Sequence, residues 1–408
     1  MANATDSVSI FAEGTFEEQI LELLSYIARN RSDEERAAFV APFQNAFKSG
    51  EGRKPIDEDE PRRKLVLSKL LLEVKGLGDG TDKEVEGFYN LIFAHIFTLH
   101  PSESPEAKQY INYLLKTISS SPSERVSVKY RVISNLFNTL PRTSPLRLAV
   151  YQTLLRIAIS KDDLDVLELT KSDVEKWLSE WQITAEEKSA FLKSIVDGFT
   201  KADQLSVAYE YSLLYVRSLP PTSEEARTAA LDLIASALRL PVVFDFDPLF
   251  KLDAVLNVKD HELFSLLHIF LSNGLAEFKE WQSKHAQTLE KYAIPADQLE
   301  RKICLLTLAS LAFDHVGQNL PYSKVADALQ VDPSEVEKWV IDVIRAGLVW
   351  GKLSQTTQSL HISRATSRSF EREQWQALEK RLVAWKAGLV GILDVVTNAK
   401  RQAGHAVV

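Results

Sequence analysis

Residues 321–364 read PYSKVADALQVDPSEVEKWVIDVIRAGLVWGKLSQTTQSLHISR, and this stretch decides the fold of the C-terminal part of the chain. Val325 and Leu329 lie on a short apolar face at helical spacing, and polar residues then interrupt the pattern. Asp332 is a good N-cap for a second helix, and Glu335 stands three residues later, where a capping box has its acidic partner. The stretch therefore predicts two helices that are joined by a tight turn.

The second predicted helix is followed by a hairpin. Gly347 supplies the left-handed residue that commonly ends a helix. Two short runs, Leu348–Leu353 and Ser359–Ile362, come next with polar residues between them, which is hairpin composition. The buried stripe of the second helix is predicted to consist of Val336, Trp339, Val340, Val343 and Ile344. Helix, turn, helix and hairpin together predict a winged helix.

Winged helices often bind nucleic acid, but the charges of this one oppose that function. Over residues 321–364, five basic residues balance five acidic ones, so the net charge is zero. The second helix, residues 333–346, carries three acidic residues against two basic ones. Because contacts from Lys and Arg to phosphate supply most of the non-specific affinity of such modules, we expect no direct nucleic-acid readout. A fold that is reused for protein contact is the favoured interpretation.

The composition of the whole chain limits the classes of protein to which it can belong. Its 408 residues are 45% hydrophobic and 25% charged, which is ordinary for a soluble globular protein with two or three cores. A net charge of -8 argues against a general polyanion binder. The single cysteine, Cys304, excludes an internal disulfide and favours a reducing compartment. With no signal-type N-terminus and no run of 18 apolar residues, we predict a cytoplasmic protein without membrane contact.

Amphipathic helical patterns fill almost all of the chain before the winged helix. Short helices joined by short turns predict an all-α helical-repeat solenoid. Helices are predicted over residues 107–119, 123–138, 145–159, 172–181, 185–200, 205–217 and 223–238. The predicted organisation is an N-terminal helical segment over 1–60, the solenoid over 61–295, the winged helix over 296–365, and a C-terminal helix with its tail over 366–408.

Two loops between predicted helices are interpreted as linkers. Pro55–Lys64 places opposite charges between prolines, which predicts a solvated linker. Lys75–Glu84 contains three glycines and could suggest a phosphate-binding loop. However, a helix rather than a strand precedes it, and no Gly-Lys-Ser or Gly-Lys-Thr follows.

No motif in the sequence supports catalysis. His261 and His268 lie seven residues apart with Glu262 nearby, but two ligands without a third do not make a metal site. Cys304, within an apolar run, is predicted to be a small core residue. We therefore predict that the chain is not an enzyme and binds neither cofactor nor metal.

The C-terminal segment carries the pattern of a helical seam. Seven apolar residues alternate at spacings of three and four, the a/d pattern over three heptads: Trp375, Leu378, Leu382, Trp385, Leu389, Ile392 and Val396. At 1.5 Å per residue the helix could extend about 55 Å, which is longer than a winged helix can cover. We predict that this seam binds partner helices. The alternative is that it folds back on the chain's own solenoid.

The hairpin offers a second predicted contact. Leu360 and Ile362 alternate with polar residues in the last strand. A short exposed hairpin edge invites pairing with a strand of another chain. We therefore predict that the strand containing Leu360 and Ile362 is an edge that pairs with a neighbouring subunit.

A helical solenoid that ends in a winged helix resembles the PCI-domain family, which the proteasome lid, the signalosome and eukaryotic translation initiation factor 3 share. One position departs from the family's usual residue: Ser354 stands where Asp is common, and Ser makes a similar, weaker turn hydrogen bond. The helix-into-wing signature of the family is similar to Ile341, Ile344, Gly347, Leu348, Gly351, Lys352, Leu353 and Gln355.

Longer stretches resemble the M-subunit family of translation initiation factor 3, from about residue 125 to 390. They include DVEKWLSEWQIT from Asp173, FDFDPLFKLDAV from Phe244 and SRSFEREQWQALEKRLVAWK from Ser367. This resemblance implies a non-catalytic scaffold that assembles with other PCI and MPN subunits on the small ribosomal subunit. It implies side-by-side contacts of winged helices and bundling of C-terminal helices. A PCI subunit of the proteasome lid or signalosome is the alternative.

Overall fold

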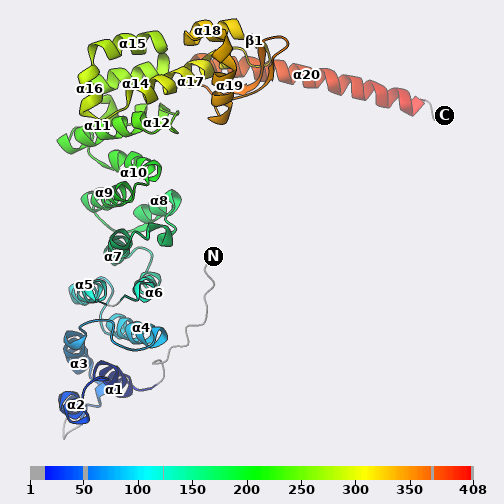
Figure 1. Ribbon diagram of the computed structural model, residues 1–408. Coiled ribbons are helices and arrows are strands. Elements are labelled where there is room, and N and C mark those ends of the chain that lie inside the picture. The colour runs from blue at the N-terminus through cyan, green and yellow to red at the C-terminus, as the bar shows by residue number, and fades with distance from the viewer. Residues whose placement is uncertain (1–13, 49–53, 123, 369–371, 406–408) are drawn as a thin grey trace. The chain divides into compact units, whose positions relative to one another are not determined.

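The computed structural model describes residues 14–48, 54–122, 124–368 and 372–405. Helices make up most of it, and a small three-stranded sheet and one long helix stand at the C-terminal end (Figure 1). The predicted fold class, a helical solenoid followed by a winged helix and a C-terminal helix, is confirmed. The chain forms two compact units, Met1–Tyr211 and Ser212–Val408, whose boundary falls within α10 (Leu205–Ser218). The predicted segment limits at residues 60, 295 and 365 stay predictions.

The first unit is a succession of short helices that pack on near neighbours in the chain. Contacts join α4 to α6, α6 to α7 and α7 to α9, which is the pattern of a solenoid. Four of these helices begin with a capping box, in which a Ser or Thr and the Glu three residues later satisfy backbone N–H groups. The helices are α1 (Phe16–Ile27), α2 (Asp33–Phe47), α3 (Glu60–Glu73), α4 (Asp82–Leu99), α5 (Pro105–Ser120), α6 (Val126–Thr139), α7 (Leu146–Lys161), α8 (Lys171–Glu180) and α9 (Ala185–Lys201), with short 3-10 turns at Ile56–Glu58 and Leu164–Leu167.

The segment Pro55–Lys64, predicted as a solvated linker, is mostly helical. Ile56 is buried, and α3 already begins at Glu60. The side chain of Asp59 caps α3 by accepting a hydrogen bond from the backbone N–H of Arg62 at 3.2 Å. The mixed charges that suggested a linker are therefore the cap and first turn of a helix.

The glycine-rich loop Lys75–Glu84 joins α3 to α4 and packs around an aromatic ring. The hydroxyl of Tyr26 donates to the backbone oxygen of Leu77 at 2.9 Å. A Cβ at Gly80 would lie 2.6 Å from the Tyr26 ring, and Gly78 has a φ of +75°. Close approach to Tyr26 and a left-handed backbone explain these glycines without a phosphate.

The second unit begins with α11 (Glu224–Arg239) and continues through short helices to the long α17 (Ala296–Asp314). α17 packs against α11 on one side and against the winged helix on the other. Cys304 on α17 is buried, as predicted. Between α11 and α17 lie α12 (Asp247–Phe250), α13 (Asp253–Leu256), α14 (Glu262–Ser272), α15 (Leu275–Lys284) and α16 (Ala286–Lys291).

The winged helix has the predicted order of elements. Gly347 ends the second helix with a φ of +70°, as predicted. The predicted capping box is wrong in one respect, because the Asp332 carboxylate accepts from the N–H of Ser334 rather than of Glu335. A 3-10 turn therefore precedes the α-helix. The elements are β1 (Asn319–Pro321), α18 (Tyr322–Leu329), the 3-10 turn Pro333–Glu335, α19 (Val336–Arg345), β2 (Val349–Ser354) and β3 (Ser359–Ala365), followed by α20 (Arg372–His405).

The sheet of the winged helix corrects the predicted edge strand. The strand order is β1-β3-β2, with both pairings antiparallel, so β3 is the central strand. Leu360 and Ile362 have no exposed surface and belong to the core. The prediction that their strand is an exposed edge is wrong, because the three-residue β1 covers it on the far side from β2.

Three buried cations and the half-buried Arg368 close the C-terminal ends of α5, α6, α11 and α14. Such ends leave backbone carbonyls without intrahelical partners, and a cation there is favourable. Lys302 donates to the backbone oxygens of Ala237 at 2.7 Å and Leu240 at 2.8 Å, at the end of α11. Burial lowers the pKa of Lys302 to about 7. The other three are Lys129 at the end of α5, Arg147 at the end of α6 and Arg368 at the end of α14.

Candidate partner-binding surfaces

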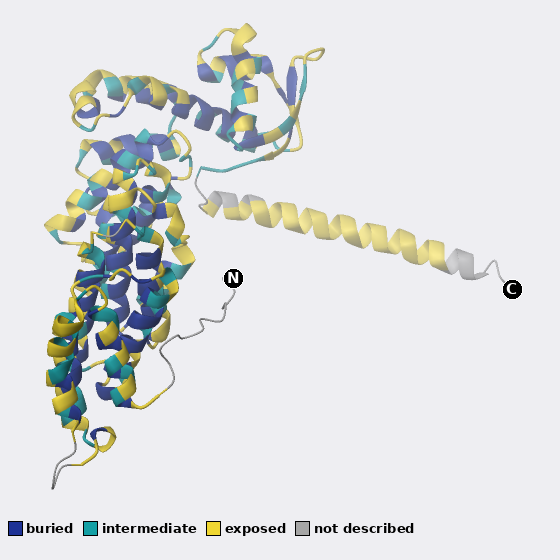
Figure 2. Ribbon diagram, turned by 60° about the horizontal axis from the view of Figure 1, so that its bottom comes forward, coloured by how far each residue is buried: buried dark blue, intermediate teal, exposed yellow. Residues whose placement is uncertain are grey.

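The predicted seam of α20 is exposed along its whole length. Figure 2 shows the described residues of this helix as exposed, in contrast to the helices before it. The exposed fraction of the seven seam residues runs from 37% at Leu378 to 66% at Trp385. The other five seam residues, Trp375, Leu382, Leu389, Ile392 and Val396, lie between these values. The seam is thus exposed to solvent in the described structure rather than buried in a core of the chain.

α20 also carries exposed apolar residues that the a/d pattern does not contain. Val383 and Val390 lie seven residues apart and so share one face of the helix. Leu393 and Val395 widen the apolar surface further, and both are more than half exposed. The i, i+7 spacing of the two valines was the signal that the seam analysis missed. From Val383 onward, α20 is therefore apolar on more than one face, which a single partner helix would not cover.

By length and composition alone, α20 is also a candidate for crossing a membrane. The segment Leu378–Lys400 has a mean hydropathy of 1.4 over its most apolar window. Its apolar residues keep the heptad spacing, and six of its residues are charged: Glu379, Lys380, Arg381, Lys386, Asp394 and Lys400. Because a span in lipid needs no heptad pattern, this spacing favours a partner helix over a bilayer. The absence of membrane contact stays a prediction.

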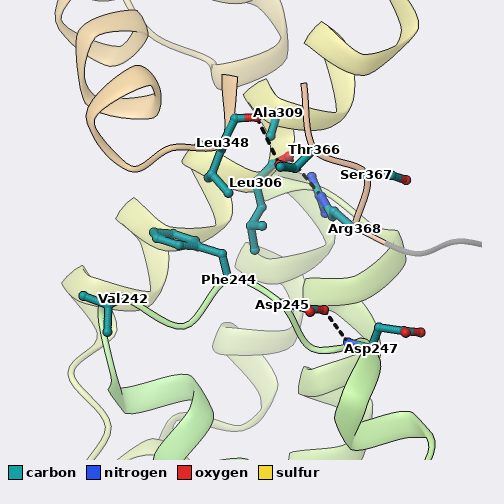
Figure 3. A pocket seen from close by; sticks show the side chains of 10 residues that line it. All are labelled: Val242, Phe244, Asp245, Asp247, Leu306, Ala309, Leu348, Thr366, Ser367 and Arg368. Carbon is teal, nitrogen blue, oxygen red and sulfur yellow. Dashed lines mark hydrogen bonds between the residues drawn. The ribbon is translucent and has the colours of Figure 1, made fainter. Parts of the chain in front are cut away.

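The chain just before α20 is anchored by Arg368. Its guanidinium donates from Nε to the backbone oxygen of Leu306 at 3.0 Å, and from Nη1 to the backbone oxygen of Asn273, the C-cap of α14. Thr366 adds a backbone contact to Leu348 at 2.8 Å (Figure 3). Burial lowers the pKa of Arg368 to about 10, so the side chain remains a cation at neutral pH. No local signal in the sequence indicates this role of Arg368, because its carbonyl partners lie 62 and 95 residues away.

Arg368 lines a cavity of about 440 Å³ beneath this anchor. Phe244, Leu306 and Leu348 supply apolar walls, while Asp245 and Asp247 lie on one side (Figure 3). The Asp245 carboxylate accepts a hydrogen bond from the backbone N–H of Asp247, which orders the turn into α12. The cavity therefore lies where the segment leading to α20 meets α12 and α17.

The predicted metal candidate serves instead as a helix cap. Nδ1 of His261 accepts a hydrogen bond from the backbone N–H of Leu263 at 3.1 Å, at the start of α14. Its Nε2 lies 3.3 Å from the hydroxyl of Tyr292, and burial lowers its pKa. His268 is exposed on the same helix. No group of three His, Cys, Asp or Glu side chains among the described residues could hold a metal ion.

Leu360 and Ile362 do not form a partner surface by themselves. Both side chains lie in the interior of the winged helix, so only the backbone edges of the sheet remain for strand pairing. Those edges are β1 and β2, and β2 is the longer of the two. A β-bulge at Trp350 and Gly351 interrupts the β2–β3 register. β2 is therefore the longer strand edge that the sheet offers to another chain.

Two family models match the C-terminal half of the chain. A model of the PCI domain matches residues 277–364. A model described as "eIF3 subunit M, C-terminal helix" matches residues 368–396. The second match begins at the anchoring Arg368 and ends at Val396, the last residue of the predicted seam.

The chain is also similar along nearly its full length to proteins named eukaryotic translation initiation factor 3 subunit M. It is 32% identical to the one from Coccidioides immitis, over 98% of this chain and 90% of that protein. The relative from Phaeosphaeria nodorum is 34% identical, over 97% of this chain and 89% of its own length. The relative from Aspergillus terreus is 32% identical, over 97% and 88%. The similarity thus includes the first 120 residues, for which the sequence resemblance was less specific.

Proposed function

The chain belongs to the subunit M family of eukaryotic translation initiation factor 3, and on this premise we propose how it acts as a scaffold subunit of that complex. We propose that it is non-catalytic and cytoplasmic. It joins other PCI and MPN subunits of the complex on the small ribosomal subunit during translation initiation. The alternative, a subunit of the proteasome lid or signalosome, is not favoured, because the relatives carry the initiation-factor name.

The exposed seam of α20 carries the proposal. Burying its seven side chains against partner helices is worth on the order of 10 to 20 kcal/mol gross, before ordering and association costs. That is enough to drive assembly, and an uncovered apolar surface of this size is costly in a chain that works alone. The seam therefore supports permanent membership of a complex.

The exposed apolar residues of α20 outside the seam indicate how many partner helices it binds. Val383 and Val390 lie outside the a/d positions, and Leu393 and Val395 extend the apolar surface in the second half of the helix. We propose that α20 pairs with one helix up to Leu382 and lies among at least two helices from Val383 onward. Bundling with helices of several subunits would satisfy both parts.

The winged helix supplies a second proposed contact, through the free edge of β2. Strand pairing there needs no exposed side chain, only backbone groups at the edge. A photo-crosslinking residue at Ser354, the last residue of β2, should capture a neighbouring PCI subunit in the assembled complex. The same residue at Asn319 on β1 should not, and the reverse pattern would assign the contact to β1.

Identification of co-purifying proteins tests the proposed function. The chromosomal copy is tagged, the complex is isolated under mild salt, and its proteins are identified by mass spectrometry. We expect initiation-factor subunits together with proteins of the small ribosomal subunit. Recovery of proteasome-lid or signalosome subunits in their place would overturn the proposal.

A further inference from the structure

The zero net charge of the winged helix conceals an uneven distribution. No Asp or Glu occurs between Val343 and Phe370, a stretch that includes the whole hairpin. The five acidic residues of the winged helix all precede it, on α18, α19 and the turn between them. The hairpin and its flanks contain Arg345, Lys352, His361 and Arg364. The wing is therefore positively charged although the module as a whole is neutral.

The sheet register gathers several of these residues on one face. His361 pairs with Asn319 on one side and with Lys352 on the other, so the three side chains form a row across the sheet. All three are exposed, whereas the neighbouring Leu360 and Ile362 are buried on the opposite face. This outer face of the sheet is thus polar and basic.

The β-bulge adds an aromatic residue and a further cation to this outer face. Trp350 pairs with Arg364 across the bulge, and the Arg364 guanidinium lies 4.5 Å from the centre of the Trp350 ring. The extra residue, Ser363, donates its hydroxyl to the backbone oxygen of Trp350 at 2.9 Å. By absorbing one residue, the bulge keeps Arg364 on the outer side with Trp350 and Lys352.

The cations of the outer face have no carboxylate partner within the described residues. By contrast, Asp342 of α19 pairs with Arg301 at 2.8 Å, and Glu337 accepts a hydrogen bond from Gln355 at 3.0 Å. The charge of Asp342 is thus balanced by Arg301, whereas Glu337 keeps its charge beside the hairpin turn at Gln355, at the opposite end of the strands from Trp350 and Arg364. The positive charge of Lys352 and Arg364 is available to an external anion.

We propose that this outer face binds the phosphodiester backbone of RNA, with Lys352 and Arg364 contacting phosphates and Trp350 offering its ring to a base. Cations beside an exposed aromatic residue are the combination that binds single strands without sequence readout. The acidic α19 opposes insertion of a helix into a groove, so the contact is through the sheet. The inference goes beyond the scaffold function and departs, for the wing alone, from the expectation of no nucleic-acid contact.

Binding of RNA by the isolated full-length chain tests this proposal apart from complex assembly. The fluorescence anisotropy of a short labelled single-stranded RNA is titrated between about 50 and 200 mM salt. The variant Lys352→Glu/Arg364→Glu is compared with Lys324→Glu/Lys338→Glu, which reverses two exposed cations on α18 and α19. Two lost phosphate contacts should lower the affinity at least about tenfold and reduce the salt slope by about 1.4. The control should bind like the original chain.

Three results would overturn the proposal. They are equal loss of affinity in both double variants, no binding by the original chain at low salt, and unchanged RNA affinity of Lys352→Glu/Arg364→Glu. Reduced incorporation of that variant into the complex, with unchanged RNA affinity, would make the face a protein contact. Thermal unfolding of every variant is followed in parallel. If the charge reversal lowers the melting temperature, Lys352→Gln/Arg364→Gln takes its place in the same comparison.

Discussion

α17 and α20 are both long helices rich in apolar residues, and they differ in what covers them. In α17, residues such as Ile303 and Leu308 have no exposed surface, and the helix packs against α11, α15 and the winged helix. In α20, every described residue is exposed, including leucines and tryptophans. Both helices carry apolar residues at helical spacing. Such spacing predicts that a face will be buried, but it does not predict whether the same chain or another chain buries it. The difference marks α17 as part of the fold and α20 as part of an assembly.

A matched pair of leucines gives the largest expected difference between the two helices. Leu308→Ala removes a fully buried side chain of α17 and should lower the free energy of unfolding by about 2–5 kcal/mol. Leu389→Ala on α20, where the side chain is 41% exposed, should change it by less than about 0.5 kcal/mol. Urea unfolding of the isolated chain measures both. Similar losses for the two variants would mean that α20 is covered by its own chain.

Acid should destabilise the buried interior and leave α20 unaffected. Burial lowers the pKa of His95 to about 4, and its Nε2 has no hydrogen-bond partner in the described structure. Below pH 6.5 the unfolded chain takes up a proton that folded His95 does not accept until about pH 4. Stability therefore falls across that window by about 3 kcal/mol at most. His95→Phe should flatten this part of the stability profile, and His268→Phe, at an exposed position, controls for the substitution itself.

Substitution of Arg368 tests the segment that connects the winged helix to the exposed α20. Arg368→Met keeps much of the side-chain volume but removes the hydrogen bonds to the Leu306 and Asn273 carbonyls, and should cost about 1–3 kcal/mol of stability. Lys386→Met, on the exposed part of α20, should cost almost nothing. The melting temperatures of the two variants check this. An Arg368→Met variant that melted like Lys386→Met would show that the anchor contributes no stability.

Two helical glycines should give small effects of opposite sign. A Cβ at Gly198 on α9 would lie 2.6 Å from Cδ1 of Ile159, so Gly198→Ala should destabilise the chain by about 1 kcal/mol or more. A Cβ at Gly388 on α20 meets nothing within 4 Å. Gly388→Ala should therefore raise helicity, by up to about 1 kcal/mol of helix propensity. Circular dichroism during heating distinguishes the two, and destabilisation by Gly388→Ala would reveal a neighbour at that face.

Local patterns in the sequence predict most of the fold. The helices at residues 107–119 and 185–200 were predicted within two residues of their observed ends, because each has a cap and a regular apolar stripe. The central place of β3 could not be predicted, since β1 is the three residues Asn319–Pro321 and has no strand pattern of its own. Leu360 and Ile362 were therefore assigned to an edge although they lie in the core.

The candidate partner-binding surfaces could also be predicted only in part from local patterns. The seam from Trp375 to Val396 was visible because heptad spacing lies within one segment, and the structure finds those residues exposed. The anchor at Arg368 was not visible, because its partners are backbone carbonyls of α14 and α17. The net charge over residues 321–364 is zero and therefore did not reveal the positive charge of the wing. Only the sheet register places Lys352 and Arg364 on one face.

Truncation after Lys380 tests the central claim, which is that the exposed apolar residues of α20 bind helices of other subunits. The melting temperature of the isolated chain and its incorporation into the complex are measured together. The account predicts nearly unchanged melting and lost or strongly reduced incorporation, because the removed residues touch little of their own chain. A large fall in melting temperature with incorporation intact would show that the seam is internal, and would contradict the account.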